Sequence, residues 1–185
     1  QAQKLYTWCP SQAPIAPRGG FLKGQQINLV FFDARAFTKK SKVECESQQF
    51  LDEITSTIKR AYPSAEIKVL GSDSYWEDAA PNTVTMKIAI SAHHAAFGAN
   101  VSVGIGSVGG EFSWGVMPEG KWNALTGFRV ELIDNRNQSR TTQRVIQKME
   151  SRPNMGGYRT ARNALDVTFS GAIGDMVFLI DEALR

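Results

Sequence analysis

Histidine and cysteine are scarce in this chain, with two residues of each among 185. A zinc site needs three or four convergent ligands, and the two histidines, His93 and His94, are adjacent. Adjacent side chains of a strand point to opposite faces, so this pair is poorly placed to hold one ion. The sequence also lacks Gly-x-Ser-x-Gly, which leaves a serine-hydrolase arrangement without support. We therefore expect no metal site and no catalytic residues.

The chain also lacks a large excess of charge of either sign. Its 21 Lys and Arg residues nearly balance its 18 Asp and Glu residues, and the two kinds are mixed along the chain. Nucleic-acid-binding proteins usually concentrate positive charge on one element, so we expect no nucleic-acid partner. No apolar run reaches the roughly 18 residues that span a bilayer. The nearest candidate, residues 176–180, is bracketed by Asp175 and Asp181. The sequence thus predicts no transmembrane segment.

The chain begins with Gln1 rather than Met, which is typical of a chain whose signal peptide has been removed. A trimmed cytosolic domain is the alternative interpretation. Export to the periplasm or the exterior is the expectation we carry forward.

Two cysteines, Cys9 and Cys45, allow one intramolecular disulfide. In an oxidising compartment the bond would tie the N-terminal region to the start of the first helix, and it would stabilise the fold by roughly 3–4 kcal/mol. In a reducing compartment both thiols would stay free. We predict the disulfide together with export.

Length and patterning predict an N-terminal arm over residues 1–26 and a single α+β domain over residues 27–185. Proline and glycine residues prevent a long helix in the arm. The expected strands cover residues 27–33, 66–70, 84–92, 128–132 and about 141–146, and the expected helices cover residues 44–62 and 158–184. This order predicts one mixed or antiparallel sheet of about five strands with both helices on one face.

The clearest helix signal lies in residues 44–62, where Phe50, Ile54 and Ile58 recur with helical spacing. The clearest strand signal lies in residues 84–92, where the even-numbered positions are apolar and therefore predicted to point inward. Asp33 and Arg35 stand two positions apart on one side of a strand, and we expect a structural ion pair there. The segment after the turn at residues 134–137 fits the second strand of a hairpin, or else a helix.

Residues 98–120 are rich in glycine, and this segment is the one anomaly in the composition of the chain. Residues 104–109 match the dinucleotide-binding pattern Gly-x-Gly-x-x-Gly, but the mechanism needs a helix after it. Glycines and Pro118 follow instead, so we expect no cofactor. Phe112, Trp114 and Trp122 lie in or beside this segment and are candidate partner-binding residues, because large aromatic side chains on flexible backbone suit recognition. The alternative is a hairpin that buries its own aromatic rings.

Arg140, Arg144 and Lys148 recur every four residues, which keeps them on one side of either a strand or a helix. They are candidate binding residues for an anionic surface. The alternative is a solvated edge strand that charge protects from unwanted pairing.

Several short segments resemble the small bacterial envelope lipoproteins of the YajG type. The opening strand Leu29–Arg35, the helix ending at Tyr62, the alternating strand and the closing helix that ends in residues 178–181 carry the likeness. The chain is similar, more loosely, to the penicillin-binding-protein activators and the amino-terminal domain of TolB. It departs from these families in lacking an N-terminal lipid-attachment cysteine and in carrying the glycine-rich segment. The resemblance implies a non-catalytic assembly role and supplies no catalytic residues.

We therefore expect an exported, non-catalytic accessory protein of the bacterial cell envelope that binds or scaffolds another envelope protein. A glycan-acting enzyme and a carrier of a small apolar ligand are the alternatives. The sequence leaves the identity of the partner and the oligomeric state open.

Overall fold

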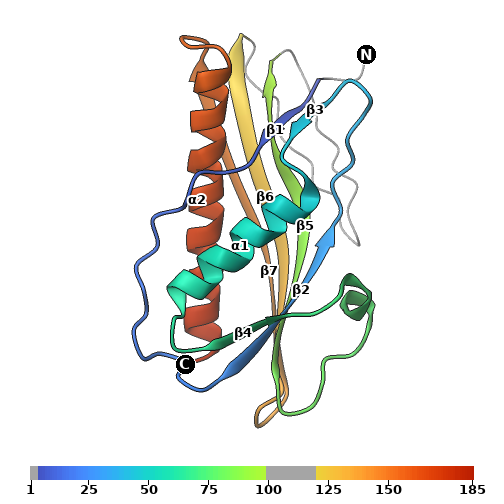
Figure 1. The fold of residues 1–185 in the computed structure, drawn as a ribbon, viewed down its shortest axis with the longest axis vertical. Coiled ribbons are helices and arrows are strands. Elements are labelled where there is room, and N and C mark those ends of the chain that lie inside the picture. Colours follow the sequence, from blue (N-terminus) through green and yellow to red (C-terminus); the bar gives the residue numbers. More distant parts are fainter. Residues whose placement is uncertain (1–3, 99–119) are drawn as a thin grey trace.

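A computed structural model describes residues 4–98 and 120–185, which form a curled mixed sheet with two helices on one face (Figure 1). In chain order the elements are β1 (Tyr6–Trp8), β2 (Gln26–Asp33), β3 (Lys42–Glu44), α1 (Ser47–Ala61), β4 (Glu66–Val69), the 3-10 helix η1 (Ser72–Trp76), β5 (Val84–Phe97), β6 (Lys121–Asp134), β7 (Arg140–Pro153) and α2 (Tyr158–Ala183).

The three longest strands, β5, β6 and β7, form an antiparallel meander of 14 residues each. The other side of β5 is shared by two strands. Its first half pairs in parallel with β2, and its second half pairs with β1 through the register Tyr6–Ala95. Strand β4 extends the sheet beyond β2, and β3 extends it beyond β1. β7 is therefore a long edge strand, whereas β3 and β4 are short ones.

Both helices cover the same face of this sheet, and their apolar sides form one core with the strands. Phe50, Ile54 and Ile58 of α1 are fully buried, as the helical spacing predicted. Helix α2 buries eleven side chains, mainly against β6 and β7. Tyr62, at the end of α1, joins the two helices because its hydroxyl donates to Asp181 at 2.7 Å.

The inward alternation of β5 changes at a β-bulge between Ile90 and Ala92. Even-numbered residues face the helices up to Ile90, but beyond the bulge His93 faces them and its ring stacks on Phe50 at 4.4 Å. A bulge adds one residue to one strand and so reverses the faces that follow. The prediction that Ala92 continues the inward series was wrong for this reason.

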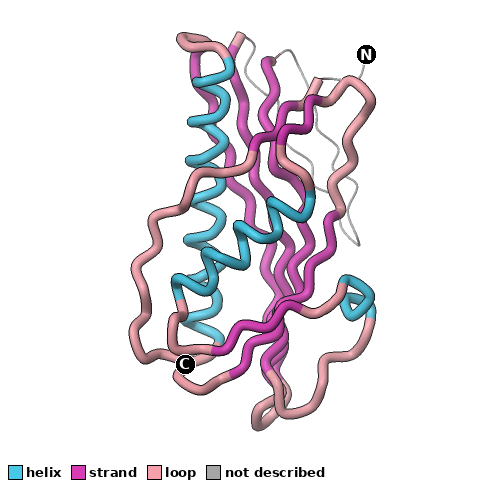
Figure 2. The backbone as a smooth tube through the Cα atoms, in the orientation of Figure 1, coloured by secondary structure: helices cyan, strands magenta, loops and turns pink. Residues whose placement is uncertain are grey.

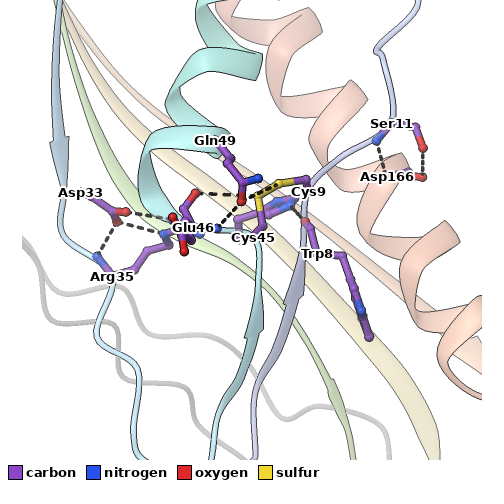
Figure 3. Close-up of a disulfide and its surroundings, with 10 residues drawn as sticks. Trp8, Cys9, Ser11, Asp33, Arg35, Cys45, Glu46, Gln49 and Asp166 are labelled. Atoms are coloured by element: carbon purple, nitrogen blue, oxygen red, sulfur yellow. Dashed lines mark hydrogen bonds and ion pairs between the residues drawn. A yellow bond between two sulfur atoms is a disulfide. The ribbon is translucent and has the colours of Figure 1, made fainter.

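The N-terminal arm crosses the helix layer and is fastened at several points (Figure 2). Ser11 donates from its backbone and its hydroxyl to Asp166 of α2, each at 2.9 Å. Arg18 forms an ion pair with Asp181 at 3.2 Å. The predicted disulfide between Cys9 and Cys45 is present, and it joins the end of β1 to the chain just before α1 (Figure 3).

The α+β class and the mixed sheet were predicted correctly, but the described residues contain seven strands rather than about five. The missed strands, β1 and β3, have three residues each, too few to show a period of two. Residue 44 belongs to β3, so the first helix begins at Ser47 instead. Its N-cap is Glu46, which forms a capping box with Gln49. The region after the turn is the second strand of a hairpin and not a helix.

Helix α2 is long and apolar enough to cross a membrane by length and composition alone. In the folded chain, 56% of its most apolar window is buried, as in the core helix of a soluble domain. Such a helix is weak evidence for a membrane span, and the absence of a transmembrane segment stays a prediction.

Candidate functional site

Strand β7 presents the longest open edge of the sheet. It pairs with β6 at every position from Asp134–Arg140 to Lys121–Pro153. Within the two described stretches of the chain, no strand pairs with its other edge. An edge strand leaves a row of backbone N–H and C=O groups without partners, and such a row can pair with another chain.

The basic strip, which we define as Arg140, Arg144 and Lys148, lies along this strand on the side that faces α2. The spacing of four keeps all three residues on one face, since the strand period is two. Arg140 and Arg144 are exposed, and their guanidinium groups form no ion pair with any described residue. Because one continuous strand covers all three residues, the predicted common face of Arg140, Arg144 and Lys148 is confirmed.

Lys148 anchors the strip to α2. Its ammonium group lies 3.0 Å from the Asp175 carboxylate. Its aliphatic stem crosses the helix at Gly171, where an added Cβ would stand only 3.2 Å from the Lys148 Cγ. Glycine therefore permits the close approach, and the charge of Lys148 is largely compensated. The two arginines are the members of the strip that stay available to a ligand.

A pocket of about 640 Å³ lies at the end of the strip, beside the β6–β7 turn. Its walls include Asp134, Arg136, Arg140 and Arg185. Arg136 donates to both carboxylate oxygens of Asp134 at 2.9 Å, so this guanidinium is held rigidly. The hydrogen bonds from Arg136 hold the pKa of Asp134 below its usual value, and the nearby charge of Arg140 lowers that pKa further. We call this cavity the arginine pocket.

The arginine pocket and the basic strip form one continuous surface, because Arg140 belongs to both. Three arginines, Arg136, Arg140 and Arg185, line the pocket together with Asp134. Guanidinium groups bind carboxylates through planar, two-point hydrogen bonds. The surface therefore suits an acidic ligand that is extended along β7.

Sequence reasoning missed the pocket because its residues come from the end of the arm, the β6–β7 turn and the end of α2. One signal was present. The spacing of Asp134 and Arg136 repeats that of Asp33 and Arg35, which form the expected ion pair at 2.8 Å. In both cases the arginine also donates from its backbone N–H to the same carboxylate.

The predicted aromatic site is largely outside the described residues, because Phe112 and Trp114 lie between residues 99 and 119. Trp122 is described and is buried in a ring cluster with Tyr6 and Tyr158. Its indole N–H donates to Asn154 at 3.1 Å. Burial and these contacts with β1 and α2 give Trp122 a packing role, whereas the roles of Phe112 and Trp114 stay a prediction.

The two histidines lie inside the protein. His93 donates from Nε2 to the Trp8 carbonyl at 3.1 Å, and its Nδ1 accepts from the Thr126 hydroxyl at 2.9 Å. Burial, with the nearby Arg35 charge, lowers the pKa of His93 to about 3 and that of His94 to about 4. Both rings are neutral at physiological pH. In the described parts of the chain, no three His, Cys, Asp or Glu side chains converge as metal ligands.

The Asp33–Arg35 ion pair lies between the end of β2 and the beginning of α1 (Figure 3). Burial alone would raise the pKa of Asp33, but hydrogen bonds from Arg35 and Ser47 hold that pKa below its usual value. The guanidinium of Arg35 also lies over the ring of Phe50 at 4.7 Å, a cation–π contact. The pair therefore links the end of β2 to the beginning of α1.

Comparison with known proteins gives a fold and no family. No family model matches the chain, and no curated protein matches its sequence. Protein XCC0632 from Xanthomonas campestris, of family DUF330, is similar in structure with a TM-score of 0.52 and 8% identity, over 92% of this chain and 91% of that one. The hypothetical protein CT253 from Chlamydia trachomatis has a TM-score of 0.51 and 10% identity, over 84% and 95%.

A PelC variant that forms a dodecamer, from Paraburkholderia phytofirmans, matches less well, with a TM-score of 0.38 and 12% identity over 87% of this chain and 93% of that one. At these identities the first two likenesses show that the fold is shared, and nothing about function. The resemblance to YajG-type lipoproteins and to TolB is tested by none of these matches and stays a prediction.

Proposed function

We propose that this protein is a non-catalytic binding protein of the bacterial cell envelope. In this proposal it captures an acidic, extended segment of another envelope protein along β7. The observation that carries the proposal is the edge of β7, which is 14 residues long and pairs on its outer side with no described strand. Arg140 and Arg144 on this strand form no ion pair with a described residue, and the arginine pocket lies at its end.

The compartment is inferred from the disulfide. The Cys9–Cys45 bond joins segments 36 residues apart, and bonds of this kind persist in oxidising compartments such as the periplasm. This supports the predicted export of the chain.

The binding mode is inferred from the edge strand. A partner segment that adds to an exposed edge gains main-chain hydrogen bonds, and its side chains give specificity. Acidic side chains on the face toward α2 would meet Arg140 and Arg144, and the end of the segment would reach the arginine pocket. Charge on an edge also prevents self-pairing, so the strip would select acidic partners against neutral strands.

Affinity capture from a native envelope extract, followed by mass spectrometry, tests the proposal. Arg140→Glu with Arg144→Glu reverses the charge of the strip, and we expect the specific partner to be lost from the captured set. Lys39→Glu with Lys40→Glu is the control, because both side chains are exposed and the change in net charge is identical. Equal capture by both double variants would remove β7 as the binding surface.

A further inference from the structure

Apart from the edge strands, β2 also has a short stretch of open edge at its carboxyl end, as far as the described residues go. β2 pairs with β5 from Ile27 to Asp33, but it pairs with β4 only as far as Leu29–Val69. One more bond follows, from the Leu70 N–H to the Leu29 carbonyl at 2.9 Å. The chain then leaves the sheet for η1. Among residues 4–98 and 120–185, the last residues of β2 therefore have a strand partner on one side only.

The exposed backbone groups can be assigned from the alternation of the strand. The Leu29 carbonyl points toward β4, whereas the Ala34 N–H donates to Ile90 of β5 at 3.0 Å. Backbone groups of alternate residues point to the same side, so those of Phe31 and Asp33 point away from β5. The register of β4 ends before it reaches them.

These backbone groups border a groove of about 650 Å³ between α1 and the ends of β2 and β4. Phe31, Leu51 and Val69 give it apolar walls, and Asp52 and Thr55 of α1 give it a polar rim. This volume is within the range of pockets that hold small ligands or short peptide segments. The Asp33 carboxylate at the inner end is already occupied, since it accepts from Arg35 and Ser47.

An aromatic cluster lies near the same end of β2, on the face of the sheet that points away from α1. Phe32, which lines the groove, lies 5.4 Å from the ring of Tyr75 and 5.3 Å from that of Trp76. Trp76 is 64% exposed although it is held in η1 by these contacts. Exposed, rigid aromatic rings are frequent anchors at binding surfaces.

We propose that this groove binds an extended peptide segment of another polypeptide, which adds as a strand to the open edge of β2. The backbone groups of Phe31 and Asp33 pair with the peptide main chain. Alternate peptide side chains meet Leu51 inside the groove and the Phe32–Trp76 cluster outside it, so apolar or aromatic residues are preferred at both positions. This groove is separate from β7, so the proposal does not depend on the acidic partner proposed for β7.

The test uses the whole chain and a phage-displayed library of short random peptides. Selected peptides are synthesised, and their affinities are measured by calorimetry against the wild type and two variants. Thr55→Arg fills the groove, because Thr55 lines it. Ser56→Arg is the matched control, since the next residue along α1 is exposed and lies outside the groove. Circular dichroism and thermal unfolding verify that both variants are folded.

We expect Thr55→Arg to weaken peptide binding by at least about tenfold, and Ser56→Arg to change it by less than about twofold. Peptides with methylated amide nitrogens give a second readout on the wild-type protein. Strand addition uses the N–H groups of alternate residues, so methylation in one register abolishes binding and methylation in the other does not.

Three results would overturn the proposal. The first is peptide binding that Thr55→Arg leaves unchanged, or that neither methylation register affects. The second is selection of no peptide while chitotriose quenches tryptophan fluorescence in the wild type but not in Thr55→Arg, which would make the groove a saccharide site. The third is self-association that Thr55→Arg abolishes, which would assign the groove to a second copy of this chain.

Discussion

Replacing Cys9 and Cys45 with alanine removes the covalent link between β1 and the chain just before α1. The bond closes a loop with a sequence separation of 36 residues. In the chain-entropy model such a loop restricts the unfolded state by about 12.8 cal/mol/K, or about 3.8 kcal/mol at 25 °C. Cys45 is buried and Cys9 is exposed, so the alanine at position 45 adds a smaller loss through packing. We expect a total loss near 4 kcal/mol in the free energy of unfolding.

Urea denaturation of the wild type, the double variant and the reduced wild type measures this loss. The reduced wild type keeps both side chains, so its difference from the oxidised protein isolates the link itself. The first region to open should be β1, because a single register pair, Tyr6–Ala95, connects it to β5. A loss below about 1 kcal/mol in the free energy of unfolding, for both the double variant and the reduced wild type, would refute the reasoning. It would mean that residual noncovalent contacts restrict the unfolded chain even without the disulfide.

Two further predictions concern the sheet and its buried rings. Gly127→Ala should destabilise the protein by about 1–3 kcal/mol, because the new Cβ would lie 2.6 Å from the Ser91 hydroxyl oxygen. Adding Ser91→Ala to Gly127→Ala should restore most of the lost stability. Gly174→Ala, where the added Cβ meets open space on α2, should instead stabilise the protein by up to about 1 kcal/mol. Thermal unfolding of these variants measures both effects. The folded-state pKa values of His93 and His94, about 3 and about 4, lie below the unfolded value of 6.5. The unfolded state thus binds more protons, so stability is full above pH 6.5 and falls progressively toward pH 4, by about 2 kcal/mol for each ring at pH 5. His94→Leu should reduce this slope by about half, and an unchanged slope would show that the ring is solvated in the folded protein.

The elements that could be predicted from the sequence are those long enough to show a period. Phe50, Ile54 and Ile58 predicted the buried side of α1. The alternation at residues 84–90 predicted the face of β5 that meets the helices, but not that the other face of β5 is buried as well. The bulge after Ile90 left no mark in the sequence, because Ala92 is apolar on either face. Strands β1 and β3 are held by pairing with each other and by the disulfide, and these are contacts between distant segments.

In the candidate sites, too, features set by local spacing were predictable and features set by chain topology were not. The common face of Arg140 and Arg144 follows from a local spacing, so the basic strip was visible before the fold was known. The arginine pocket needs Arg185 beside the β6–β7 turn, and the peptide groove needs β4 to end before β2 does. Those facts depend on chain topology, which local periodicity does not contain.

Hydrogen exchange of the complex with the captured partner tests most directly whether β7 is the binding edge. If the partner adds as a strand, amides in residues 140–153 should exchange more slowly in the complex, and Arg140→Glu with Arg144→Glu should abolish the effect. Slower exchange at another surface, with unchanged rates throughout β7, would contradict the proposed function.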